Sequence, residues 1–379
     1  MLGGATRANW KWLCTGREIF ADMAAAIDAA RQTVCLETYI YSPGQLADRL
    51  RGAFVRAAQR GVRVRVLVDA LGSHRLPGAY WEALLAAGGE ARQFNPLAPE
   101  RFGIRDHRKL LVCDGTVAFV GGFNIASEYE GDGVTAGWCD IGLRLEGPVA
   151  AELAAAFEEM FQRSEFQHRR FMRLRKAWAK RAVVVEKEQL LLSGPGRGRS
   201  PIKRALKADL GDARDVRIMT AYFLPTWRIR RQLIRVTRRG GRVRLLLAGK
   251  SDVLIAHLAG RSLYRRLLKA GIEIYEYQPQ ILHAKLVIID NAVYAGSANL
   301  DQRSLNINYE LMIRFDNADM ADQAREIFEE NLKYCRRITS EAWAKARTLW
   351  GRLKQRWAYT ILMRADPYIA RKQWKEMVD

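Results

Sequence analysis

Short apolar runs alternate along the chain with longer segments in which apolar residues recur at helical spacing. The runs Val34–Tyr41 and Gly61–Val68 are typical of buried strands, and a helical pattern follows that ends near Leu84–Gly88. Strands that alternate with helices in this way favour an α/β fold, in which helices cover a mixed sheet.

The same order of patterns returns later in the chain, which indicates an internal repeat. Val216–Phe223 resembles Val34–Tyr41, and Gly240–Leu247 resembles Gly61–Val68. Further pairs follow in the same order: Leu84–Gly88 with Leu267–Gly271, His107–Asp114 with His283–Asp290, Val120–Asn124 with Ala295–Asn299, and Trp138–Leu145 with Asn308–Phe315. The sequence therefore predicts two similar mixed-sheet halves, flanked by helices and related by a pseudo-twofold axis.

The repeat divides the chain into four parts. We expect a first half over residues 1–162 and a second half over residues 201–335. Residues 163–200 are basic and then rich in Gly, Pro and Arg, as expected of a connector. Residues 336–379 form a basic, Trp-rich C-terminal segment.

This C-terminal segment has the pattern of an amphipathic helix. Trp343, Trp350 and Trp357 recur every seven residues, and Leu353 and Ile361 lie at compatible offsets among several Lys and Arg residues. Such a helix can dock its apolar stripe on the core of the protein. It can also lie in a membrane interface, with its cations against anionic lipid. The sequence leaves both alternatives open.

Composition narrows the class of protein. Hydrophobic residues make up 49% of the 379 residues, which is ordinary for a globular protein. The five cysteines are scattered without a CxxC pair, which argues against a disulfide framework or a zinc site. We find neither a signal-peptide pattern nor an apolar run long enough to span a bilayer, so we expect a soluble or peripheral protein.

The formal net charge of +21 is the unusual number. Two thirds of this excess lies in Arg163–Arg181 and Arg336–Asp379. A basic surface attracts polyanions, which here means phospholipid headgroups or nucleic acid. Composition alone does not choose between them.

Candidate chemistry lies in a pattern, HxKxxxxD, that occurs twice in the repeat. The first copy contains His107, Lys109 and Asp114, and the second contains His283, Lys285 and Asp290. Residues i and i+2 share one face of a strand, so each copy presents an imidazole beside an ammonium group. A small-residue turn and an asparagine follow each copy, Asn124 in the first half and Asn299 in the second. Two copies in a duplicated frame make a packing role improbable.

These motifs resemble the phospholipase D superfamily, over about residues 30–335. The stretches Gly121–Asn124 and Gly296–Ser304, with Asn308–Glu310 downstream, are further similar to bacterial cardiolipin synthases of the short type without N-terminal transmembrane helices. The resemblance implies a phospholipase D-like fold. It also implies that His107 is the nucleophile and His283 the general acid and base, an assignment that the symmetry of the repeat cannot supply.

The other motif residues have roles that suit phosphodiester chemistry. Lys109, Lys285, Asn124 and Asn299 suit the binding of phosphate oxygens, because charge builds there in the transition state. Asp140 and Glu310, at equivalent positions of the repeat, are expected to orient the imidazoles. By the resemblance, Asp114 and Asp290 brace the motif loops. We expect no cofactor and no metal ion.

The favoured function is phosphatidyl transfer from one phospholipid to the headgroup hydroxyl of another through a phosphohistidine, as in cardiolipin synthesis. The alternative is a phosphodiesterase of the same fold that hydrolyses phospholipid or nucleic acid. A non-catalytic binding protein is disfavoured by the two intact motifs. We expect anionic phospholipids as partners and a peripheral location on the cytoplasmic face of the bacterial inner membrane. Nucleic acid is disfavoured as a partner, and the oligomeric state is not indicated.

Overall fold

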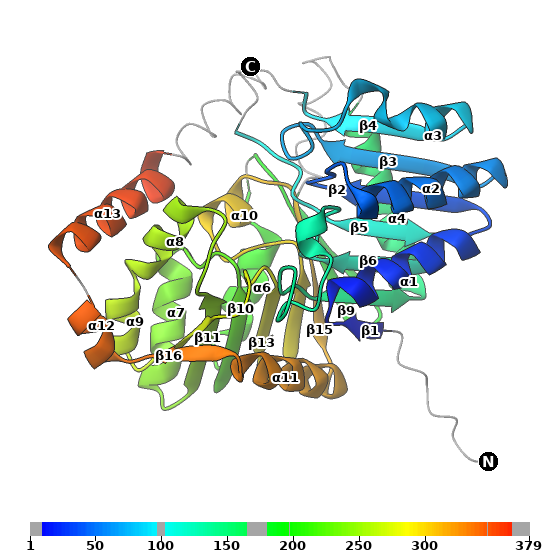
Figure 1. Cartoon of the computed structure of the whole chain (residues 1–379). Helices are drawn as coiled ribbons and strands as arrows, with labels where there is room; N and C mark the ends of the chain where they lie inside the picture. The colour runs from blue at the N-terminus through cyan, green and yellow to red at the C-terminus, as the bar shows by residue number, and fades with distance from the viewer. Residues whose placement is uncertain (1–9, 97–102, 165–179, 197, 347, 366–379) are drawn as a thin grey trace, which may run out of the picture.

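The computed structural model describes residues 10–96, 103–164, 180–196, 198–346 and 348–365. Figure 1 shows two sheets side by side, each with helices on its outer face. The first sheet has seven strands in the order β1-β7-β6-β5-β2-β3-β4. Its strands are β1 (Trp10–Leu13), β2 (Thr33–Thr38), β3 (Arg63–Asp69), β4 (Glu90–Phe94), β5 (Leu110–Cys113), β6 (Val117–Gly121) and β7 (Gly142–Glu146).

The second sheet has nine strands in the order β16-β12-β11-β10-β13-β14-β15-β9-β8. They are β8 (Arg181–Val185), β9 (Glu188–Ser193), β10 (Asp215–Thr220), β11 (Arg242–Ala248), β12 (Glu273–Tyr277), β13 (Lys285–Ile289), β14 (Ala292–Gly296), β15 (Glu310–Asp316) and β16 (Cys335–Ile338). The order β7-β6-β5-β2-β3-β4 repeats as β15-β14-β13-β10-β11-β12, with three parallel strands and three antiparallel strands in each copy. The predicted fold of two mixed sheets is therefore confirmed.

The helices cover both sheets and fill the space between them. They are α1 (Gly16–Ala29), α2 (Gln45–Gln59), α3 (Glu82–Ala86), α4 (Pro148–Ser164), α6 (Pro201–Asp209), α7 (Trp227–Arg238), α8 (Leu254–Arg261), α9 (Tyr264–Lys269), α10 (Gln302–Asn306), α11 (Ala318–Leu332), α12 (Ser340–Ala346) and α13 (Leu349–Thr360). Helices α1 and α2 share one apolar cluster with the outer face of the first sheet, and α6, α7 and α9 share another with the second.

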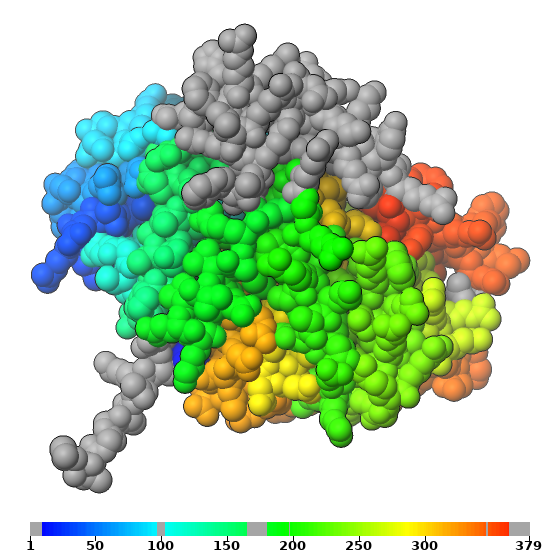
Figure 2. All heavy atoms as spheres, turned by 180° about the vertical axis from the view of Figure 1, so that it is seen from behind, coloured from blue at the N-terminus to red at the C-terminus, as the bar shows by residue number. Residues whose placement is uncertain are grey.

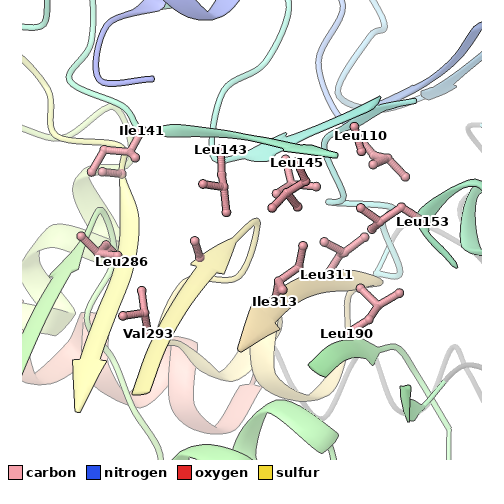
Figure 3. Packing of buried hydrophobic residues seen from close by; sticks show 14 of the residues in the cluster. Leu110, Ile141, Leu143, Leu145, Leu153, Leu190, Leu286, Val293, Leu311 and Ile313 are labelled. Carbon is pink, nitrogen blue, oxygen red and sulfur yellow. The ribbon is translucent and has the colours of Figure 1, made fainter. Parts of the chain in front are cut away.

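A single apolar core joins the two halves. Side chains of the first sheet, such as Leu143 and Leu145, point toward Leu311 and Ile313 of the second, as Figure 3 shows. Helices α4 and α11 complete this core with residues that include Phe157 and Phe328. Burial of apolar surface between the halves ties them together, since neither sheet could expose this face to water without a large cost in free energy.

Two segments differ from the expected plan. Residues 181–193 fall within the expected connector, yet they form the hairpin β8–β9, which extends the second sheet beyond β15.

The C-terminal segment is divided into the strand β16 and the helices α12 and α13. Trp343 on α12 is buried against Tyr264, with ring centroids 4.9 Å apart, whereas Trp350 and Trp357 on α13 are 76% and 64% exposed. The three tryptophans therefore do not share one helical face.

Helix α13 packs on the protein through its other face. It lies along α8, and Ala358 and Gln355 are buried there. Figure 2 shows the C-terminal helices at the edge of the molecule. Among the described residues we find no helix with both the length and the hydropathy that a membrane span requires.

Candidate active site

The two motif histidines lie where the halves meet. Each precedes a strand, β5 or β13, that pairs antiparallel with the first parallel strand of its sheet, so both lie toward the carboxyl ends of the parallel strands. The amide of His107 donates to the carbonyl of Tyr309, and the amide of His283 donates to the carbonyl of Cys139, at 3.0 and 2.7 Å. Backbone hydrogen bonds thus attach each histidine to the opposite half.

His107 is paired with a carboxylate of the second half. Its Nδ1 lies 3.0 Å from Glu310 Oε1, and the Ser297 hydroxyl donates to the same carboxylate. Burial, followed by the charges of Lys109 and Lys285, holds the pKa of His107 well below its usual range. Burial also raises the pKa of Glu310 to about 8, although Lys109 opposes that change.

His283 is paired with a carboxylate of the first half. Its Nδ1 lies 2.8 Å from Asp140 Oδ2, so Nε2 is the ring nitrogen that faces away from the carboxylate. The ring is enclosed by Tyr129 and Trp138, with centroids at 5.1 and 5.5 Å. Burial and the nearby Lys285 lower the pKa of His283 to about 4, although Asp140 acts in the opposite direction.

Both motif lysines are buried beside their histidines. Lys109 Nζ donates to the carbonyl of His107 at 2.7 Å, and Lys285 Nζ donates to the carbonyl of His283 at 2.5 Å. Lys285 Nζ also lies 2.7 and 3.0 Å from Nδ1 and Nε2 of the His283 ring. Burial lowers the pKa of Lys109 to about 7 and that of Lys285 to about 8. Each lysine also lowers the pKa of the histidine in the other half, which indicates that the two motifs share one electrostatic site. Such a site favours a bound anion, because negative charge offsets the cost of burying two ammonium groups.

The two motif asparagines have different partners. Asn124 accepts a hydrogen bond from the amide of Ile40 and donates to the Tyr129 hydroxyl, at 3.1 and 2.7 Å. The Tyr129 oxygen is 3.4 Å from His283 Nε2. Asn299 Oδ1 lies 3.4 Å from the Thr220 hydroxyl. Asn124 therefore holds the Tyr129 hydroxyl near Nε2 of His283.

Tyr129 is the site residue that sequence reasoning missed. It lies five residues after Asn124, in a short 3₁₀ turn at Ser127–Tyr129, and it has no counterpart in the aligned motifs of the second half. Comparison of the two halves therefore gave no signal for it. A second tyrosine, Tyr39, adjoins the other histidine, with its ring 5.1 Å from that of His107.

Asp114 and Asp290 lie away from the histidines, in the turns that follow β5 and β13. Both have a left-handed backbone, with φ of 54° and 51°, which Asp tolerates better than most residues. Asp114 accepts hydrogen bonds from the amides of residues 31–33, and Asp290 accepts from those of residues 214 and 215. Each aspartate thus ties its turn to the start of the neighbouring parallel strand.

The turn after each motif fits the carboxylate nearby. A Cβ atom on Gly122 would lie 2.5 Å from Asp140 Oδ1 and 2.9 Å from the carbonyl oxygen of His283, so only glycine fits there. The equivalent residue, Ser297, instead donates its hydroxyl to Glu310. Among the described residues, no group of three or more His, Cys, Asp or Glu side chains could hold a metal ion.

Comparisons with known proteins agree with this geometry. Residues 23–164 and 206–332 match the family model described as "Cardiolipin synthase, PLD-like domain". Cardiolipin synthase 1 of Bacillus cereus is 31% identical over 359 residues, which cover 90% of this chain and 70% of that protein. Cardiolipin synthase B of Shigella flexneri is also 31% identical over 359 residues, which cover 92% of this chain and 86% of that protein.

A solved structure supports the fold. The crystal structure of phosphatidylserine synthase from Haemophilus influenzae Rd KW20 matches with a TM-score of 0.76 over 97% of this chain and 96% of that chain. Its sequence is only 13% identical, so the likeness concerns the fold alone.

Proposed function

The chain belongs to the cardiolipin synthase family with a phospholipase D-like domain, and from this premise we propose that it transfers a phosphatidyl group between phospholipids to form cardiolipin. The observation that carries the proposal is the buried site in which each histidine is paired with a carboxylate of the opposite half and a lysine of its own. The enzyme is accordingly a phosphatidyltransferase that acts on phosphodiesters.

We propose a two-step mechanism on the motif residues. The Nε2 lone pair of His107 attacks phosphorus, the bond from phosphorus to the departing headgroup oxygen breaks, and His283 donates a proton to that oxygen. In the second step His283 takes the proton of the acceptor hydroxyl, whose oxygen attacks phosphorus as the bond to His107 breaks. Lys109 and Lys285 stabilise the charge on the phosphate oxygens.

The environment of each histidine supports these roles. A neutral His107 is needed for attack, and burial beside two lysines keeps its pKa low. His283 must carry a proton in the first step, and a bound phosphodiester anion would raise its pKa together with Asp140. His283 Nε2 also has the Tyr129 hydroxyl within 3.4 Å, which suits a proton-transfer residue. Asn124 and Asn299 are proposed to donate to phosphate oxygens, and Asp114 and Asp290 to brace the two motif loops.

We further propose that the protein acts at a membrane surface, on the cytoplasmic face of the bacterial inner membrane. The net charge of +21 supports binding to anionic lipid, and so do the exposed tryptophans of α13. The two halves, over residues 1–162 and 201–335, are proposed to act as one catalytic unit.

The direct test is product analysis. Purified protein is incubated with phosphatidylglycerol alone, with phosphatidylglycerol and phosphatidylethanolamine, and with a single-stranded oligonucleotide. We expect cardiolipin in both lipid reactions and none with the His107→Ala variant. Phosphatidic acid as the only lipid product would instead indicate a hydrolase, and cleavage of the oligonucleotide at a comparable rate would indicate a nuclease.

The covalent step has its own test. The enzyme is acid-quenched during turnover of phosphatidylglycerol with a labelled phosphatidyl group, and the adduct is mapped by peptide mass spectrometry. We expect the label on His107, with more of it in the His283→Ala variant if the second step is slowed more than the first. A label that maps only to His283 would reverse the two roles, although phosphatidyl transfer would still stand.

A further inference from the structure

A second basic surface lies outside the catalytic site, on the outer flank of the second half. A groove of about 1190 Å³ runs between α7 and α9. Seven cationic side chains line it: Arg230, Arg231, Arg235, Arg238, Arg265, Arg266 and Lys269. Three of them, Arg231, Arg235 and Arg238, are spaced by four and three residues, so they share one face of α7.

Within the residues that the structure describes, these cations have no carboxylate partner. Neither α7 nor α9 contains a carboxylate, and within the described part of the chain none of the seven residues forms an ion pair. Seven like charges around one groove repel each other, which is tolerated only where an anion or solvent compensates. The groove therefore has the chemistry of a binding site for several phosphate groups.

The internal repeat provides a comparison. Helix α2 occupies the position in the first half that α7 occupies in the second, and it also carries arginines. Those arginines are paired: Arg49 with Glu130, Arg51 with Asp48 and Arg56 with Asp28, at 2.7, 3.3 and 3.0 Å. The same fold position is thus neutralised in one half and left cationic in the other, so the helix position itself does not require unpaired arginines.

Apolar side chains adjoin the groove. Ten large hydrophobic side chains are exposed in the described part of the chain, and seven of them lie on α7, on α13 or at the start of α8: Trp227, Val253, Leu254, Leu349, Trp350, Leu353 and Trp357. Helix α13 lies along α8, and α12 contacts α9, as Figure 1 shows. A second hollow of about 620 Å³, lined by Arg352, Arg356 and Leu353 of α13, shares Ser262 with the groove.

The combination of cations and exposed tryptophan favours one class of partner. Nucleic acid would need the phosphate-binding groove but not aliphatic side chains that project into solvent. A bilayer interface takes up both, because tryptophan and leucine enter the headgroup layer while arginine binds lipid phosphate. Trp227 begins α7 directly after the loop that follows β10, at the end of the sheet where His283 lies.

We propose that the groove between α7 and α9 binds the phosphate groups of anionic phospholipids in a bilayer, at a site separate from the catalytic histidines, with α13 inserted in the interface beside it. The inference deepens the proposed function, on which it rests only for the choice of lipid as partner. A lipid phosphate bound in the groove would hold the second half, including the end of its sheet where His283 lies, against the membrane that supplies the substrate.

The test compares two triple variants of the full chain. The groove variant carries Arg231→Gln, Arg235→Gln and Arg238→Gln. The control carries Arg31→Gln, Arg63→Gln and Lys187→Gln, which also remove three positive charges. These exposed residues lie at the strand ends that are farther from the histidines. Binding is measured by co-sedimentation with vesicles of phosphatidylcholine that contain phosphatidylglycerol or lack it. Activity is measured separately on dispersed short-chain phosphatidylglycerol.

We expect the groove variant to bind the anionic vesicles about 100-fold more weakly, because each cation near such a surface contributes about fivefold. The control should lose much less, and both variants should keep normal turnover of the dispersed lipid and normal thermal stability. Equal losses in the two variants would overturn the proposal in favour of net charge. Tighter binding of an oligonucleotide than of vesicles at the same salt would overturn it in favour of nucleic acid. Absence of any lipid product would contradict the proposed function, whereas the binding of vesicles by the groove would still be tested by the co-sedimentation measurement.

Discussion

At the scale of single residues, the pairing of each histidine with a carboxylate of the other half is the central feature. His107 pairs with Glu310 and His283 with Asp140. An ionised carboxylate accepts a hydrogen bond from the Nδ1–H group and leaves Nε2 with its lone pair. A protonated carboxyl instead donates a hydrogen bond to Nδ1, so the ring proton of the neutral imidazole lies on Nε2. In the proposed mechanism, the protonation state of Glu310 therefore decides whether His107 can attack phosphorus.

This arrangement predicts a bell-shaped pH dependence of kcat/KM. Attack by His107 needs an ionised Glu310, whose pKa burial raises to about 8, so the competent fraction of the enzyme falls toward acid pH. Charge stabilisation needs a protonated Lys109, whose pKa burial lowers to about 7, so the competent fraction also falls toward alkaline pH. Because the first pKa lies above the second, only a minority of molecules carries both charges at any pH, and we expect a low maximum between about pH 7 and 8, measured from initial rates on dispersed phosphatidylglycerol.

The Glu310→Gln variant separates the two limbs. Its kcat should fall by about 100-fold or more, because an amide no longer fixes the imidazole tautomer. The acid limb should vanish, and the alkaline limb should move to lower pH, because the charge of Glu310 raises the pKa of Lys109 and the amide does not. An unaltered acid limb would show that another group is responsible for it.

At the scale of elements, the turns after β6 and β14 place the carboxylates by different means. Gly122→Ala puts a Cβ atom within 2.5 Å of Asp140, so Asp140 must move from His283. A displacement of about 1 Å costs roughly 100-fold in rate, and we expect that loss in kcat. Ser297→Ala removes only the hydroxyl that donates to Glu310 and lowers its pKa. The pKa of Glu310 should therefore rise in this variant, and the acid limb of the pH profile should move to higher pH.

Measurements of kcat against pH for both turn variants check this difference, and thermal unfolding serves as the control for folding. In the Gly122→Ala variant the acid limb of the pH profile should stay at its original pH, because Glu310 pairs with His107 and not with His283. Equal behaviour of the two variants would mean that the turns do not act through separate carboxylates.

The C-terminal elements show where periodicity fails as a guide. A seven-residue spacing predicted one face for Trp343, Trp350 and Trp357, but α12 ends at Ala346 and α13 begins at Leu349. The Thr348 hydroxyl accepts from the amide of Gly351 at 3.0 Å and caps the new helix. The threonine was a visible signal for a helix start, whereas the burial of Trp343 beside Tyr264 depends on contacts that no local pattern contains.

At the scale of the whole molecule, the repeat made much of the fold predictable. Aligned strand patterns identify corresponding strands directly, so the common order of six strands followed from the duplication. The pairing of Glu310 with His107 could not be read in the same way. Asp140 and Glu310 follow their own motifs by similar distances in sequence, and only the packing of the two halves decides which histidine each carboxylate reaches.

The shared core and the exchanged carboxylates together predict that neither half works alone. Fragments 1–179 and 180–379 would each expose leucines that now pack between the sheets, such as Leu143 and Leu311, and neither fragment holds a complete histidine–carboxylate pair. We expect each fragment expressed alone to be insoluble or inactive, and co-expression to restore cardiolipin formation. The intact chain should unfold in one calorimetric transition, because separation of the halves would cost the apolar burial of both. A soluble second fragment that makes cardiolipin by itself would require a second copy of His283 to replace His107, and would contradict a site built across the two halves of one chain.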